Sequence, residues 1–185
     1  VQAISQGVPK KIQPEIKKGL TDEQKRLLAE LDAERQRRRI EERYQTFIPN
    51  GKQAEFIKLV GNGETFVCLL VAGNGLGKSA TLINILANIC FKPKNPYFAG
   101  LPLFENFPYL KDIRIASDPA TVTSKIVPEI IKWFPKGQYS NLKAGKMYEC
   151  QWKTSTGFNI DILTYEQEVK EHESVDKGLV LFYPT

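Results

Sequence analysis

Ala72-Gly73-Asn74-Gly75-Leu76-Gly77-Lys78-Ser79 is the stretch that decides which fold this chain is expected to adopt. Residues 65–71 before it, TFVCLLV, are apolar and β-prone, which is typical of a buried parallel strand. Residues 80–89 after it, ATLINILANI, carry apolar side chains at helical spacing. A strand, a glycine-rich turn and a helix in this order predict a phosphate-binding loop.

The residue types of this stretch suit the phosphates of a nucleotide. Backbone N–H groups converge on phosphate oxygens only where side chains do not intervene, and the three glycines supply that freedom. The helix expected to begin near Gly77 adds the positive end of its dipole. We expect Lys78 to reach the β- and γ-phosphates of ATP and the Ser79 hydroxyl to ligate Mg²⁺. The predicted nucleotide-binding residues of the loop are Ala72, Gly73, Asn74, Gly75, Leu76, Gly77, Lys78 and Ser79.

Length and composition indicate one domain with an appendage. The chain has 185 residues, of which 42% are hydrophobic, so it can bury a core. Its formal net charge of +5 slightly favours an anionic partner. The three cysteines are an odd number without framework spacing, which predicts reduced thiols in a cytosolic compartment. No apolar stretch approaches the length that spans a membrane.

Three segments are expected along the chain. Residues 1–20 have little core-forming pattern and are predicted to be a flexible N-terminal arm. A charged helix is predicted within residues 21–46, because Thr21 and Gln24 have the spacing of a capping box. Residues 47–185 are predicted to form an α/β P-loop ATPase core with a mostly parallel sheet flanked by helices, plus a β-hairpin.

Further patterns predict the elements of this core. Asp118 and Pro119 suit the N-cap and first turn of a helix. Strands that alternate with helices around the loop favour the parallel sheet. The expected elements besides those around the loop are a helix at 52–60, an irregular link at 91–110, a strand at 112–117, a helix from 119 to about 135, hairpin strands at 148–153 and 158–162, and a last apolar strand at 178–182.

The base of the nucleotide needs a contact of its own. Gln53 lies upstream of the loop, and a glutamine amide donates and accepts at once, which matches the N6/N7 edge of adenine. Tyr44 or Phe47 would stack on the ring or pack beside it. An ordinary surface glutamine at the start of a helix is an equally good interpretation of Gln53.

The order of these motifs resembles the N-terminal ATPase domain of the large terminase subunit of tailed bacteriophages. The resemblance covers about residues 44–182 and rests on Gln53, the AGNGLGKS loop, a strand ending in Ser117-Asp118, the hairpin, Tyr165-Glu166-Gln167 and the last strand. It implies a DNA-packaging motor in which Lys78 acts in catalysis, Ser79 holds Mg²⁺ and Gln53 contacts the adenine of ATP. It also implies double-stranded DNA, a portal protein and a small terminase subunit as partners, a homo-oligomeric ring, and the host cytoplasm rather than a membrane.

The chain departs from that family at two places. The family has Asp-Glu after the last strand, to hold Mg²⁺ and activate water, whereas Tyr183-Pro184-Thr185 follow here. The chain is therefore expected to be part of a larger protein, without the family's nuclease domain, and to hydrolyse ATP slowly. The loop also lacks an arginine, so an arginine finger must come from elsewhere. The acidic alternatives are Asp161, Glu166, Glu168 and Asp176, and the arginine candidates are Arg114 and the cluster Arg35, Arg37, Arg38 and Arg39.

Two other interpretations stay open. Another P-loop DNA translocase or helicase would share the loop. A helicase would be expected to have a DEAD-like acidic box and a GTPase an Asn-Lys-x-Asp element, and the sequence contains neither. A non-hydrolysing module that binds ATP and assembles with partners is favoured by the missing carboxylate pair. The excess charge also predicts weak, sequence-independent binding of duplex DNA. The expected DNA contacts are Lys132, Lys136, Lys143 and Lys146.

Overall fold

The computed structural model describes residues 21–64, 67–71, 75–143, 147–165 and 176–182. The chain divides into two units, Val1–Ile40 and Glu41–Thr185. Helix α1 (Asp22–Glu41) begins after Thr21, whose backbone N–H donates to Gln24 Oε1 at 2.9 Å. The reciprocal bond from the Gln24 N–H to Thr21 Oγ1 is 3.3 Å, so the predicted capping box is confirmed. The helix ends earlier than expected, and a 3₁₀ turn, η2 (Arg43–Thr46), follows it.

The second unit contains the remaining elements. Asp118 accepts a hydrogen bond from the Thr121 N–H at 2.8 Å, which confirms the predicted N-cap of the helical segment that follows β1. That segment passes through a π-helical turn, η3, before α6. The elements are α2 (Gly51–Gly61), α3 (Lys78–Phe91), α4 (Pro102–Glu105), β1 (Asp112–Ser117), α5 (Pro119–Thr121), η3 (Val122–Ile126), α6 (Val127–Trp133), β2 (Tyr139–Leu142), β3 (Gln151–Thr154), β4 (Asn159–Thr164) and β5 (Leu179–Phe182).

The five strands form one mixed sheet in the order β2-β3-β4-β1-β5, and the prediction of a mostly parallel sheet is therefore wrong. β4, β1 and β5 run parallel, whereas β3 is antiparallel to both β2 and β4. The turn before β4 is too short for a crossover, because parallel neighbours need a connection of a dozen or more residues. Gly157 in that turn has φ of 89°, a left-handed conformation that favours glycine.

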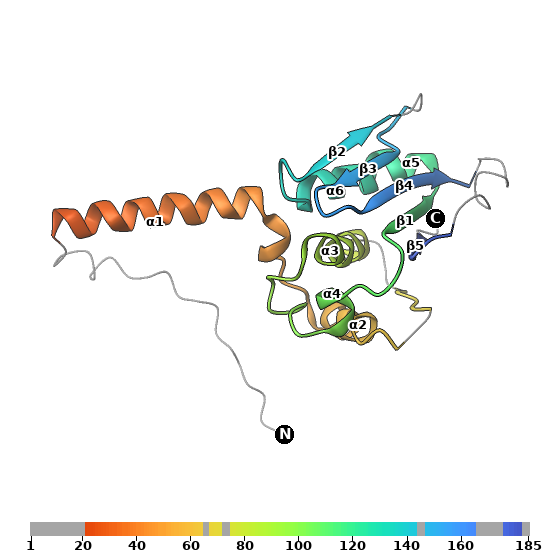
Figure 1. The fold of residues 1–185 in the computed structure, drawn as a ribbon, viewed down its shortest axis with the longest axis horizontal. Coiled ribbons are helices and arrows are strands. Elements are labelled where there is room, and N and C mark those ends of the chain that lie inside the picture. Colours follow the sequence, from red (N-terminus) through yellow and green to blue (C-terminus); the bar gives the residue numbers. More distant parts are fainter. Residues whose placement is uncertain (1–20, 65–66, 72–74, 144–146, 166–175, 183–185) are drawn as a thin grey trace, which may run out of the picture. The chain divides into compact units, whose positions relative to one another are not determined.

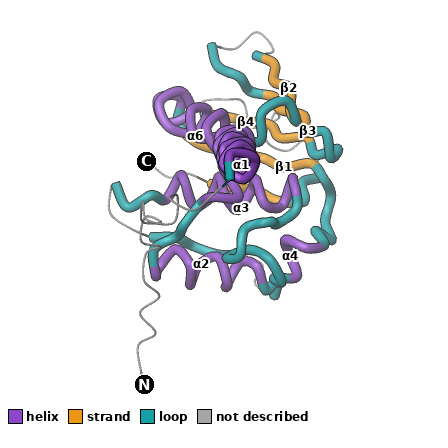
Figure 2. The backbone as a smooth tube through the Cα atoms, turned by 90° about the vertical axis from the view of Figure 1, so that its left-hand side faces the viewer, coloured by secondary structure: helices purple, strands orange, loops and turns teal. Residues whose placement is uncertain are grey.

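The core lies between the helices and one face of the sheet. Helix α3 lies between α2 and the sheet in both views of the backbone (Figure 1 and Figure 2). Ile83 and Leu86 of α3 are completely buried, as are Ile113 and Ile115 of β1. The apolar patterns therefore indicated residues that are buried, but burial extends beyond one face: residues 83–91 of α3 and residues 113–117 of β1 are all buried.

The strand expected directly before the loop is not present in the described residues 67–71. Val67, Leu69 and Val71 are exposed by 74%, 77% and 82%, while Cys68 and Leu70 are half-buried against the core. Within the described part of the chain, none of the five strands pairs with this segment. An apolar run supplies side chains for a buried strand, but its backbone also needs a hydrogen-bonding neighbour, which the pattern cannot predict.

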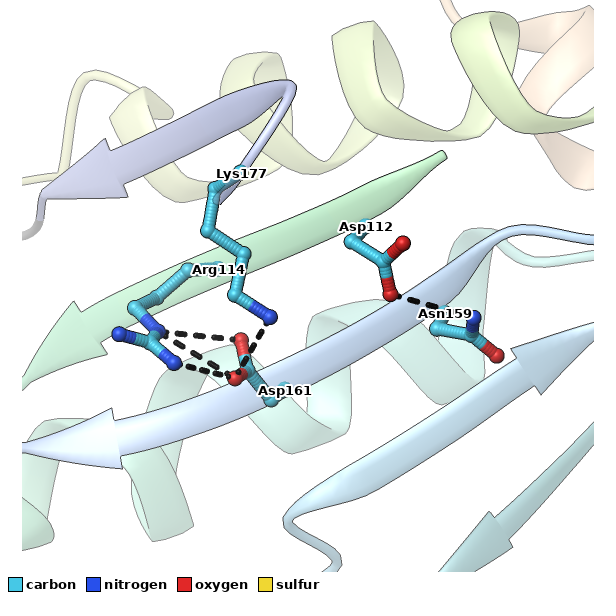
Figure 3. Close-up of polar contacts among 5 residues, drawn as sticks. All are labelled: Asp112, Arg114, Asn159, Asp161 and Lys177. Atoms are coloured by element: carbon cyan, nitrogen blue, oxygen red, sulfur yellow. Dashed lines mark hydrogen bonds and ion pairs between the residues drawn. The ribbon is translucent and has the colours of Figure 1, made fainter. Parts of the chain in front are cut away.

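An ion-pair network crosses the other face of the sheet (Figure 3). Arg114 of β1 lies opposite Asp161 of β4, and its Nη2 is 2.8 Å from Asp161 Oδ2. Lys177, just before β5, contacts the same oxygen at 3.1 Å. Asp112 accepts a hydrogen bond from the Asn159 side chain at 3.2 Å nearby. The network of Arg114, Asp161 and Lys177 thus ties three chain segments together at the middle of the sheet.

Two further observations concern membrane-spanning helices and the state of the cysteines. None of the helices within the described ranges is long and apolar enough to cross a membrane. Cys68, Cys90 and Cys150 form no disulfide, in agreement with the expected thiols. Burial raises the pKa of the Cys90 thiol well above its ordinary value, which makes this sulfur a poor nucleophile.

Candidate functional site

The loop that was predicted to bind phosphate is described from Gly75 onward. Ala72, Gly73 and Asn74 lie outside the described residues. Gly75 and Gly77 have φ of 81° and 78°, so both adopt the left-handed conformation that the motif requires of glycine. Gly77 is the N-cap of α3, and the helix begins at Lys78 as expected.

The first turn of α3 is anchored on the carbonyl oxygen of Gly77. The Thr81 N–H and the Thr81 hydroxyl both donate to this oxygen at 2.9 Å. Thr81 is completely buried, while Lys78 and Ser79 are half-buried. The start of the helix is therefore held firmly, with its positive dipole end at the loop.

Gln53 contacts the same loop from α2. Its Nε2 donates to the carbonyl oxygens of Leu76 and Gly77 at 3.2 Å and 3.3 Å. Its Oε1 accepts from the Asn50 N–H at 2.8 Å, while Asn50 Oδ1 accepts from the Gln53 N–H at 3.0 Å. Asn50 and Gln53 thus form a capping box for α2. Contact between Gln53 and adenine stays a prediction, and the two hydrogens of its amide nitrogen already have protein acceptors.

A cleft of about 790 Å³ opens beside these residues. It lies between α2, residues 69–71 before the loop, and the start of α3. Lys78 and Lys52 contribute positive charges, of which Lys52 pairs with Glu55 at 2.9 Å, and Phe56 contributes an aromatic ring. The lining residues are Asn50, Gly51, Lys52, Gln53, Glu55, Phe56, Leu59, Leu69, Leu70, Val71, Leu76, Lys78 and Thr81. Its size is within the range of small-molecule sites, and its mainly apolar wall with a few polar groups is typical of them.

Neither aromatic residue proposed to stack on the base lies in this cleft, so that part of the prediction is wrong. Tyr44 is 2% exposed, packs against the Phe91 ring and donates to the Phe91 carbonyl at 3.4 Å. Phe47 is 7% exposed and packs edge-on against Trp133. Both belong to the core because aromatic rings gain most from complete burial. Phe56 borders the cleft instead, although it is only 8% exposed and belongs to the same core.

The acidic and arginine candidates are only partly accounted for. Asp161 forms ion pairs with Arg114 of β1 and with Lys177 just before β5. Asp176 is exposed, and Glu166 and Glu168 lie outside the described residues. Arg114 is buried in its pair with Asp161, so it does not project as a finger.

The charged groups on the surface are partly paired. In α1, Arg35 and Arg37 pair with Asp32 and Glu34 at 3.7 Å and 2.8 Å. Of the lysines expected to contact DNA, Lys132, Lys136 and Lys143 are exposed, and Lys146 lies outside the described residues. Lys132 contacts Glu129 at 3.5 Å and Lys143 contacts Glu149 at 3.9 Å, which lowers their net positive charge toward a ligand.

Comparison with known proteins gives no relative from which a role could be transferred. No protein-family model, curated protein or solved structure matches this chain. The assignment therefore depends on the loop itself. Two left-handed glycines, a helix start, a lysine and a hydroxyl lie within residues 75–79, and of these residues Leu76 and Lys78 line the cleft.

Proposed function

We propose that this chain is the ATP-binding motor domain of a viral DNA-packaging terminase, which couples ATP hydrolysis to movement of double-stranded DNA into a procapsid. The observation that carries the nucleotide-binding part is Gly77, which caps α3 with φ of 78° beside a cleft that Lys78 lines. In this proposal Lys78 binds the β- and γ-phosphates, and Ser79 holds Mg²⁺.

The terminase part of the proposal is supported by motif order. The loop precedes β1, which ends at Ser117 and is followed by Asp118, then a hairpin, and finally an apolar strand parallel to β1. A portal protein, a small terminase subunit and further copies of the chain in a ring are the proposed partners. Other P-loop DNA motors share parts of this order, so DNA preference is the property that separates them.

Calorimetry with Mg-ATP tests the nucleotide site. We expect Lys78→Ala to weaken binding by about 10- to 100-fold, because a hydrogen bond to a charged group contributes about 1.5–3 kcal/mol. Lys58→Ala is the matched control, since Lys58 is exposed on α2 and is not among the residues that line the cleft. Equal ATP affinity for the parent and Lys78→Ala would remove the basis of the proposal.

Gel shifts with duplex and single-stranded DNA of equal length test the motor class. A packaging motor should bind duplex DNA at least as tightly as single strands, with affinity that falls steeply as salt rises. Lys136→Ala, which removes an exposed lysine, should weaken binding modestly and reduce the salt slope by about 1. Clear preference for single-stranded DNA would favour a helicase instead.

A further inference from the structure

Gln53 connects two parts of the candidate site that are far apart in sequence. Its side-chain amide lies on α2, whereas both of its acceptors, the carbonyls of Leu76 and Gly77, belong to the loop before α3. We infer that Gln53 is a positioning residue that holds this loop ready for phosphate, rather than a reader of the base. We call its two bonds to the loop the Gln53 clamp.

The direction of these bonds determines where the loop amides point. A trans peptide unit is planar, and its C=O and N–H groups point in opposite directions. The described part of the chain has no cis peptide bond. The carbonyls of Leu76 and Gly77 point toward the Gln53 amide, so the N–H groups of Gly77 and Lys78 in the same peptide units point away from it. Two consecutive amides are thereby turned to one side, as anion binding requires.

Space around Gly77 agrees with this role. A Cβ atom at Gly77 would lie 2.7 Å from Gln53 Nε2, which is closer than a real contact allows. The glycine is therefore needed for its left-handed φ and for the approach of the glutamine. The Gly77 carbonyl also accepts both bonds from Thr81, so the clamp acts on the oxygen that anchors the first turn of α3.

The other end of the glutamine amide is fixed as well. Gln53 Oε1 accepts from the Asn50 N–H at 2.8 Å, which sets the orientation of the amide and leaves Nε2 toward the loop. Paired recognition of adenine needs a hydrogen on Nε2 that is not already bonded. Here both hydrogens of Nε2 are donated to the carbonyls of Leu76 and Gly77. The clamp instead lowers the ordering cost of the loop before any ligand arrives, and such preorganisation strengthens binding of any polyphosphate.

This inference rests on the proposed phosphate site, and inorganic tripolyphosphate is the probe that separates phosphate from base. Gln53→Glu is the informative variant, because it keeps Oε1 for the capping box and puts an oxygen opposite two carbonyl oxygens. We expect it to weaken Mg-tripolyphosphate, Mg-ATP and Mg-GTP by the same factor, about tenfold, the equivalent of roughly one hydrogen bond. Lys58→Ala should leave all three affinities unchanged.

Selective loss of ATP affinity, with tripolyphosphate affinity retained, would overturn the clamp. It would show instead that Gln53 contacts the adenine base. Unchanged affinity for all three ligands would overturn it as well.

If the parent protein bound no tripolyphosphate, the proposed function would fail. The clamp would then be judged from amide exchange in the ligand-free protein. Exchange at the Thr81 N–H, which donates to Gly77, should speed up at least about tenfold in Gln53→Glu and stay unchanged in Lys58→Ala. Equal Thr81 exchange in parent and Gln53→Glu would refute the clamp by itself.

Discussion

Replacing Asp161 with Asn tests how strongly the ion-pair network on the sheet stabilises the second unit. Asp161 accepts from Arg114 Nη2 at 2.8 Å and from Nε at 3.3 Å, and it contacts Lys177 Nζ at 3.1 Å. The Arg114 and Lys177 side chains are only 8% and 11% exposed. Removing one partner of a fully buried pair costs about 3–5 kcal/mol, and Asp161 is itself 25% exposed, so we expect a loss of about 2–3 kcal/mol.

Urea unfolding followed by tryptophan fluorescence provides the measurement, since Trp152 is buried next to this region in β3. Asp112→Asn is the matched control: it makes the same change on the same face, where the carboxylate accepts only a side-chain amide bond in the described contacts. The control should lose no more than about 1 kcal/mol. The network would not be a significant source of stability if both variants lowered the free energy of unfolding equally. The same would follow if Asp161→Asn lowered it by less than about 0.5 kcal/mol.

Three further predictions concern the frame around the site. Gly178→Ala should lower the free energy of unfolding by at least about 2 kcal/mol in the same urea assay, because its Cβ would lie 1.9 Å from the Leu110 carbonyl oxygen; a neutral result would mean that the entry to β5 is loosely packed. Leu69→Thr should change stability by less than about 0.5 kcal/mol, since the side chain is exposed, and a loss above about 1.5 kcal/mol would mean that the predicted strand forms in solution. Hydrogen bonds from Thr121 hold the pKa of Asp118 below its usual value, so its contribution is complete above the unfolded pKa of about 3.9 and disappears as pH falls through the lower folded value. Asp118→Asn should therefore flatten the acid limb of a stability–pH curve below about pH 4, and an identical curve would contradict that linkage.

Much of the local structure was predictable because it depends on residues close in sequence. The Asp118 cap needs only the N–H of Thr121 three residues later. Strand β1 has the predicted bounds, and its apolar residues Ile113 and Ile115 are completely buried. The left-handed Gly77 before α3 likewise follows from the loop motif itself.

The errors share a cause, which is that their outcome depends on partners far away in the chain. Residues 67–71 have the composition of a buried strand, but composition does not supply a neighbouring backbone. Strand β2 was missed because it is short and mostly exposed, and it exists only through its antiparallel pairing with β3. That pairing, with the hairpin between β3 and β4, is also what makes the sheet mixed.

The features of the candidate site likewise depend either on residues close in sequence or on partners far away in the chain. The sequence by itself determined the local geometry of the loop, because left-handed glycines and the start of α3 depend on residues within one turn. Only the tertiary structure decided that Gln53 donates to Leu76 and Gly77, and that Tyr44 packs in the core rather than beside a base. A side chain's local pattern shows what it is able to bond, but which partner it meets is set by how α2, the loop and α3 pack together.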